Sequence, residues 1–94
     1  MAANHARGEV VAVLAGRPRR LCLTLGALAE LETAFDARGW EDLAARLRDL
    51  SAGDLTLVLA ALLRGGGDEP GDLSGVELGE AARAVAAAFT AAGG

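Results

Sequence analysis

The sequence contains no lysine and no tyrosine, and it has one histidine and one cysteine among its 94 residues. Every cation outside the single histidine is therefore an arginine, and the formal net charge is −4. An acidic chain without a basic stripe is a poor match for nucleic acid, because binding to the phosphate backbone depends on cations that release counterions. The triple glycine at 65–67 is not a P-loop either, since no lysine exists to meet a phosphate.

The lone cysteine and histidine give little chemistry. One cysteine excludes an internal disulfide and a cysteine-rich metal site. Cys22 lies in a predicted strand with no histidine near it in sequence, so we expect it to pack rather than react. His5 lies in segment 1–8, which we predict to be a flexible arm that cannot hold it beside a nucleophile. We therefore predict no catalytic residue, no metal, no cofactor and no enzyme activity.

Long apolar runs are also missing. The longest largely apolar segment, Leu55–Leu63, is about half of what a membrane-spanning helix needs. The early run Val10–Ala15 lacks the apolar core and basic lead of a signal peptide. The sequence therefore predicts a cytoplasmic protein with no membrane partner.

Small apolar residues are what the chain has in abundance. Hydrophobic residues make up 52% of it and aromatic residues only 3%, which suits close helix packing better than a sandwich or barrel. A domain of this size hides only about 60–65% of the surface that its unfolded chain exposes. We therefore predict a single domain, residues 9–92, that leaves some apolar side chains for a partner or a second copy.

Residues 9–25 predict a β-hairpin. Glu9–Leu14 is rich in β-branched residues, and Arg20–Leu25 alternates strictly between apolar and other residues. Between them Ala15–Pro18 supplies the glycine and proline of a four- to five-residue loop. The leucines expected on the inner face are Leu21, Leu23 and Leu25.

Helical spacing follows the hairpin, so the predicted fold is mainly α with a small β-hairpin, an α+β fold. The predicted helices span about 26–38, 40–50, 52–64 and 75–92, with a flexible glycine-rich loop at 65–73. The expected helix signals are an N-cap at Thr24, a left-handed residue at Gly39, and capping boxes from Ser51 to Asp54 and from Ser74 to Glu77. The last apolar stripe comprises Leu78, Ala82, Val85, Ala86 and Phe89.

Segment 52–64 is apolar on almost all sides, so we expect it to lie centrally or to share a face with another chain. The predicted partner-binding surface comprises Leu57, Leu62 and Leu63, with Trp40 at its rim. Trp40 is alternatively a cap over the core, which the general burial of tryptophan favours.

The remaining charged residues favour structural roles. Arg17, Arg19 and Arg20 are either a nucleic-acid contact or a solvated turn, and the net charge favours the turn. Glu30 and Glu32 diverge on a helix and cannot converge on one substrate atom. We expect both carboxylates on solvated faces.

Two motifs carry a resemblance to a known family. LTLGALAELE, at 23–32, is followed some thirty residues later by LRGGG, with a hairpin before them and an alanine-rich helix after them. This arrangement resembles the small tail proteins of gene transfer agents and related tailed phages, classed as tail assembly chaperones and sometimes labelled tail tube proteins. Segment 68–79 departs from that pattern, because it is short and rich in glycine.

The resemblance implies a non-enzymatic tail assembly chaperone that binds the tape-measure protein and keeps it soluble while tail tube subunits polymerise around it. It implies the tape-measure protein as partner, with tube subunits or further copies of this chain as others, and a place in the cytoplasm or in the phage-like particle. The alternative is a structural tail or head-tail joining component. A small acidic regulator or antitoxin is a third class, but the sequence shows no DNA-reading element and no toxin-wrapping tail.

Overall fold

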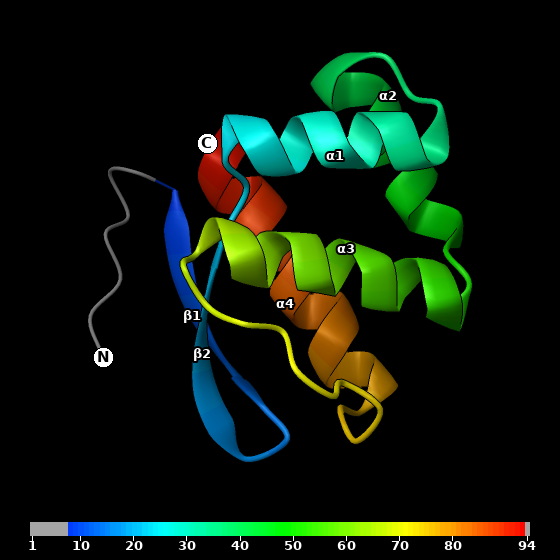
Figure 1. The fold of residues 1–94 in the computed structure, drawn as a ribbon. Helices are drawn as coiled ribbons and strands as arrows, with labels where there is room; N and C mark the ends of the chain where they lie inside the picture. The colour runs from blue at the N-terminus through cyan, green and yellow to red at the C-terminus, as the bar shows by residue number, and fades with distance from the viewer. Residues whose placement is uncertain (1–7, 94) are drawn as a thin grey trace.

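The computed structural model describes residues 8–93, so the predicted flexible arm at 1–8, with His5, lies outside the described residues except for Gly8. The elements are β1 (Glu9–Leu14), β2 (Arg17–Cys22), α1 (Leu25–Phe35), α2 (Gly39–Arg46), the 3₁₀ helix η2 (Leu47–Asp49), α3 (Ala52–Gly65) and α4 (Leu78–Gly93). The predicted fold class is confirmed: an N-terminal antiparallel hairpin is followed by four α-helices within these residues (Figure 1).

The hairpin turn is tighter than predicted. Leu14 pairs directly with Arg17, so the loop has only two residues. Ala15 and Gly16 both have positive φ, 52° and 80°, as in the two-residue turns whose twist matches that of the strands. Pro18 is therefore not a turn residue and pairs opposite Val13 inside the strand. The predicted four- to five-residue loop is wrong because Pro18 lies in β2 and not in the turn. Both strands of a two-stranded sheet are edge strands, and edge strands tolerate proline.

The second strand also ends earlier than the leucine alternation indicates. Leu21 is fully buried, but β2 stops at Cys22 and Leu25, which was expected on the inner face, is 83% exposed. The reason is the helix that follows: the Thr24 hydroxyl accepts a hydrogen bond from the Ala27 N–H at 3.1 Å. The predicted N-cap is confirmed, and it forces Leu25 into the first helical turn.

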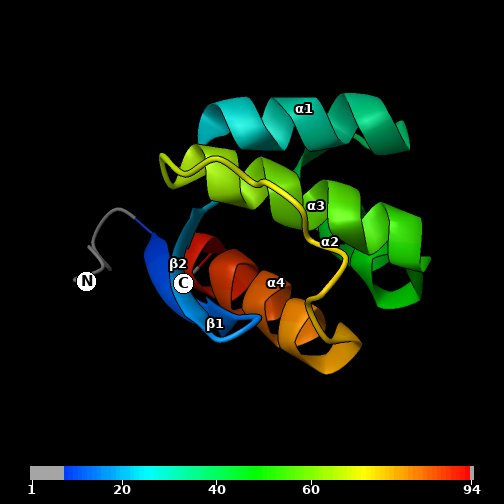
Figure 2. The ribbon, with the colours of Figure 1, turned by 60° about the horizontal axis from the view of Figure 1, so that its bottom comes forward.

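Helix α3 lies between α1 and α4, and the hairpin lies beside its C-terminal end (Figures 1 and 2). Its buried residues are Leu55, Val58, Leu59, Ala61, Leu62 and Leu63. The predicted central position is therefore confirmed. A capping box opens this helix as predicted, with the Ser51 hydroxyl and the Asp54 N–H 3.1 Å apart and the Asp54 carboxylate accepting from the Ser51 N–H.

The glycines that end α3 allow it to touch β2. A Cβ on Gly65 would lie 2.2 Å from the Cys22 carbonyl oxygen, and one on Gly66 would lie 2.4 Å from the Arg20 carbonyl oxygen. Any larger residue would collide with backbone, so the LRGGG motif is explained by packing. The outer edge of β2 is covered by this contact.

Three helix boundaries differ from the prediction. Helix α1 ends at Phe35 and its C-cap Asp36 has a φ of 51°, while Gly39, expected to end this helix, is left-handed but starts α2. Helix α2 ends at Arg46 and continues as the 3₁₀ helix η2, where one helix to about residue 50 was expected. Helix α4 begins at Leu78, about three residues later than predicted, because Ser74 does not cap it. The Ser74 N–H instead donates to the Asp72 carboxylate at 2.9 Å, which forms a turn before the helix.

Candidate partner-binding groove

An apolar groove crosses the N-terminal halves of α3 and α4. It consists of two adjoining hollows of about 290 and 310 Å³ that share Leu55 and Leu78. One hollow lies beside the link between α3 and α4, residues 66–77. It is lined by Thr56, Leu59, Leu73, Ser74, Val76 and Ala81, among others. The hollow beside η2 is lined by Leu47, Arg48, Leu50, Ala82, Val85 and Ala86. Figure 2 shows the link running along α3 to the start of α4.

Leu78 lies at the junction of the two hollows. It is 69% exposed although it is a large apolar residue. Ala82 and Ala86 follow it at intervals of four and are also exposed, so they form a flat strip along α4. Arg48 is the charged residue of the groove, and it has no hydrogen bond or ion pair within residues 8–93. The groove thus offers apolar walls, small residues and one unpaired cation.

The partner surface predicted from the sequence must be corrected. Leu62 and Leu63 are 0% exposed and belong to the core, so neither can contact a partner in this fold. A central helix that is apolar on all sides packs most of those sides against the rest of its own chain. Leu57 is 39% exposed on α3 but does not line the groove.

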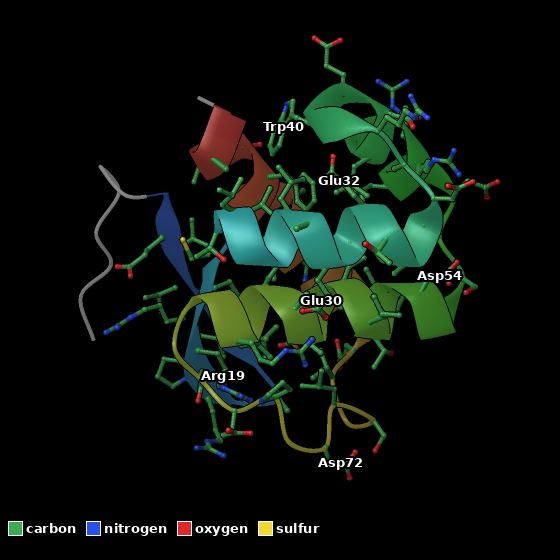
Figure 3. All side chains as sticks on the ribbon, turned by 45° about the horizontal axis from the view of Figure 1, so that its top comes forward. Arg19, Glu30, Glu32, Trp40, Asp54 and Asp72 are labelled. Atoms are coloured by element: carbon green, nitrogen blue, oxygen red, sulfur yellow. The ribbon has the colours of Figure 1, made fainter. Side chains whose placement is uncertain are left out.

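The Trp40 side chain packs over the C-terminal end of α4. Its ring stacks on Phe89 with centroids 5.2 Å apart and an interplanar angle of 27° (Figure 3). It packs partly buried against the core, which agrees with the reading of Trp40 as a core cap. Its role in partner binding stays a prediction.

The groove residues of α4 were missed because the apolar stripe of this helix was placed too broadly. Val85 and Phe89 are buried as expected, but Ala82 and Ala86 from the same predicted stripe are exposed. The other buried residues of α4 are alanines, namely Ala81, Ala84 and Ala88. Alanine is too common on both faces of this helix to mark the buried one, so only the fourfold spacing of residues 78, 82 and 86 could have indicated a second stripe.

The arginine cluster of β2 is structural in part. The Arg19 side chain is 11% exposed and donates to the Asp68 carboxylate at 2.7 Å and to the Glu69 carbonyl oxygen at 2.6 Å (Figure 3). The hydrogen bond from Arg19 lowers the pKa of Asp68, against a smaller opposing effect of burial. Arg19 therefore fastens the glycine-rich link to the hairpin and is not a solvated turn residue. The Nε of Arg20 is buried without a hydrogen-bond partner in the described part of the chain.

The paired carboxylates of α1 diverge, as predicted, but both have partners. Glu30 forms an ion pair with Arg64 of α3, and Glu32 accepts a hydrogen bond from the Gly39 N–H at 2.5 Å (Figure 3). They join α1 to α3 and to the start of α2. Glu30 is exposed, as expected, but Glu32 is half-buried, so the expectation of a solvated face was wrong for Glu32. Cys22 is a buried free thiol, consistent with its predicted packing role.

Residues 8–93 contain neither a metal-binding cluster nor a membrane-spanning helix. No group of three or more His, Cys, Asp or Glu residues there is arranged to hold a metal ion. No helix there combines the length and the apolar character that crossing a membrane requires.

Comparison with known protein families gives a match over nearly the whole chain. A family model described as "Phage tail tube protein, GTA-gp10" matches residues 7–93. No curated protein and no solved structure matches the chain.

Proposed function

We propose that this chain, which belongs to the GTA-gp10 family of phage tail tube proteins, is a tail assembly chaperone that binds the tape-measure protein. The family match covers nearly the whole chain and confirms the resemblance seen in the sequence. It makes the protein a component of a phage or gene transfer agent tail system, in a family of tail proteins rather than of enzymes. The chaperone role and the tape-measure partner are the finer steps proposed here.

The apolar groove is the observation that carries the proposal. A long, aggregation-prone helical client needs a small protein that covers its apolar face, and a groove between helices is a common site for such a face. The groove holds Leu78 largely exposed and is lined mainly by leucine, valine and alanine. The formal charge of −4 would keep the loaded complex soluble. Trp40 and Leu57 stay proposed secondary contacts outside the groove.

A structural tail component is the second candidate, and β1 is the observation that favours it. The sheet has only two strands within the described residues, and β2 is covered by Gly65 and Gly66. Val11 and Val13 of β1 are 36% and 56% exposed. In a two-stranded sheet β1 is an edge strand, and an edge strand can pair with a strand of another subunit, as ring-forming subunits require. Two strands alone do not form such a ring.

Co-expression with the tape-measure protein of the same tail system tests the two candidates. The chaperone proposal predicts that this chain raises the soluble fraction of the tape-measure protein and co-purifies with it. An unchanged soluble fraction together with no complex contradicts the proposal. Stoichiometric recovery of this chain from purified, finished tails would favour the structural component instead.

A further inference from the structure

We infer that the apolar groove binds its client segment as a helix, with an apolar face and an acidic residue placed to meet Arg48. This inference deepens the proposed function and rests on it, since it specifies the part of the client that the chaperone recognises. It also assigns the site to Leu78, Ala82, Ala86 and Arg48, none of which the sequence analysis had selected for partner binding.

The walls of the groove exclude an extended client. They are formed by α3, α4, η2 and the link at 66–77, none of which is a strand that an extended segment could pair with. An extended segment in this groove would bury its own N–H and C=O groups without partners, which costs free energy for each group. A helix brings its backbone hydrogen bonds already formed.

The floor on the α4 side is suited to close helix packing. Ala82 and Ala86 are exposed one turn apart, and Ala82 lies one turn after Leu78. Small residues at this spacing let a second helix approach, while Leu78 can insert between side chains of that helix. Apolar residues at i, i+3, i+4 and i+7 of the client would fill the two hollows.

Arg48 supplies the charge that distinguishes clients. It is exposed at the groove beside η2 and has no ion pair or hydrogen bond within residues 8–93. A guanidinium at the rim of an apolar site favours a carboxylate on the partner and disfavours a cation. The client helix therefore carries an aspartate or glutamate beside its apolar face.

A second copy of this chain fits the groove less well. The other exposed large apolar residues of the described chain are scattered over three elements, as Leu25 on α1, Leu57 on α3, and Val11 and Val13 on β1. Among the helices that carry them, only α1 has a second exposed apolar residue one turn on, and that residue is the small Ala29, which would not fill two adjoining hollows. The occupant is therefore a helix of a different protein.

The test uses the full chain, co-expressed with the tape-measure protein, and two pairs of matched variants. Leu78 and Leu25 are each the first residue of a helix and both are exposed, but only Leu78 lines the groove. Ala86 and Ala87 are adjacent exposed residues of α4, and only Ala86 lines the groove. We expect Leu78→Glu and Ala86→Arg to reduce capture of the tape-measure protein at least about tenfold, with Leu25→Glu and Ala87→Arg near wild type.

Charge reversal tests the acidic partner. Arg48→Glu is compared with Arg83→Glu, because Arg83 is also exposed without a described partner and lies outside the groove. We expect Arg48→Glu to weaken binding of overlapping synthetic peptides from the tape-measure protein about threefold to tenfold, with a loss that shrinks at high salt. The best-binding peptide should gain helical circular dichroism on binding, and changing its acidic residue to lysine should restore binding to Arg48→Glu.

The outcomes separate the inference from the proposed function. If wild-type protein captures the tape-measure protein and the groove variants do so equally well, the function stands and the groove assignment is overturned. A bound peptide that gains no helix overturns the helical client. If the chain alone sediments as a dimer and Leu78→Glu makes it monomeric, the occupant is a second copy. No capture by folded wild-type protein overturns both, and circular dichroism of each variant confirms that it folds.

Discussion

A single alanine holds the least favourable backbone conformation in the hairpin. Ala15 has a φ of 52° and precedes Gly16, whose φ is 80°. Residues other than glycine, asparagine and aspartate are disfavoured in this region because their Cβ crowds the backbone. The turn nevertheless needs both positive φ angles, since it connects Leu14 and Arg17 with two residues.

Replacing Ala15 should therefore stabilise the protein. We expect Ala15→Asn or Ala15→Gly to raise the free energy of unfolding by about 0.5–1 kcal/mol, because glycine has no Cβ to crowd the backbone and asparagine tolerates a positive φ through local hydrogen bonds of its side chain. Both variants keep the N–H that donates to the Glu80 carboxylate at 3.3 Å. Urea denaturation measures the change. Gly16→Ala is the opposite control, since nothing lies within 4 Å of its Cβ and any loss reports backbone strain alone; equal stability of all variants would contradict this account.

Gly66 should tolerate no side chain. A Cβ there would lie 2.4 Å from the Arg20 carbonyl oxygen, so Gly66→Ala must push α3 away from β2. We expect a loss of about 2–3 kcal/mol, as for other overpacked contacts. Gly75→Ala is the matched control, because no atom lies within 4 Å of its Cβ and its φ is not in the left-handed region. Thermal unfolding of the two variants compares them, and equal melting temperatures would rule out the close approach.

At the scale of elements, local sequence signals predicted two helix N-caps, but they did not predict the contacts between elements. The caps at Thr24 and Ser51 were correct because each needs only an oxygen three residues from an N–H. The predicted end of β2 is three residues too late, because the alternation of leucines continues into α1. The N-cap at Thr24 sets the boundary between β2 and α1. The roles of Arg19 and Glu30 depend on partners 49 and 34 residues away, which no local pattern shows.

The tie between the hairpin and the glycine-rich link should depend on pH. The pKa of Asp68 is lowered below 3.8 in the folded protein by the hydrogen bond from Arg19. Its contribution to stability is therefore fully present above about pH 4 and is lost as the pH falls through the folded pKa. We expect Asp68→Asn to lower the melting temperature at neutral pH and to reduce the further loss seen on acidification below pH 4.

Asp49→Asn is the control for this pH dependence. Asp49 is exposed, and no ion pair of Asp49 is seen within residues 8–93. This variant should keep the acid dependence of the wild type. If Asp68→Asn and the wild type lose the same stability between pH 4 and pH 2, the ion pair of Asp68 and Arg19 does not contribute to folding.

At the scale of the whole molecule, the groove could not be predicted because four separate segments form it. Besides α3, the segments are η2, the link and α4, which contribute Leu47, Leu73 and Leu78. The composition did predict that apolar surface would stay outside, and Leu78 at 69% exposure agrees with that expectation. Its location depends on how η2 and the link are placed against α4. Burial of Leu62 and Leu63 depends on the same packing, so the sequence misplaced the site on α3.

Trp40 and Phe89 join the middle of the chain to its C-terminal helix, and they allow the cooperativity of the whole fold to be measured. Trp40 is the single tryptophan and stacks on Phe89 at 5.2 Å, so its emission reports the docking of α2 on α4. A small single domain usually unfolds in one step. We expect the unfolding curves from tryptophan emission and from helical circular dichroism to coincide in urea. Phe89 is 5% exposed, so Phe89→Ala should cost about 3–5 kcal/mol, and Phe89→Leu less because it leaves a smaller cavity.

The two curves also decide how independent α2 is. If tryptophan emission changes at lower urea than circular dichroism, α2 opens by itself while α3 and the hairpin stay folded. Phe89→Leu would then move only the emission curve. Coincident curves that shift together in both variants show instead that the stacking of Trp40 on Phe89 belongs to one cooperative core, which includes Leu43 of α2 at 0% exposure. The core of α3 then holds the groove walls in place, because Leu55 and Leu59 belong to both.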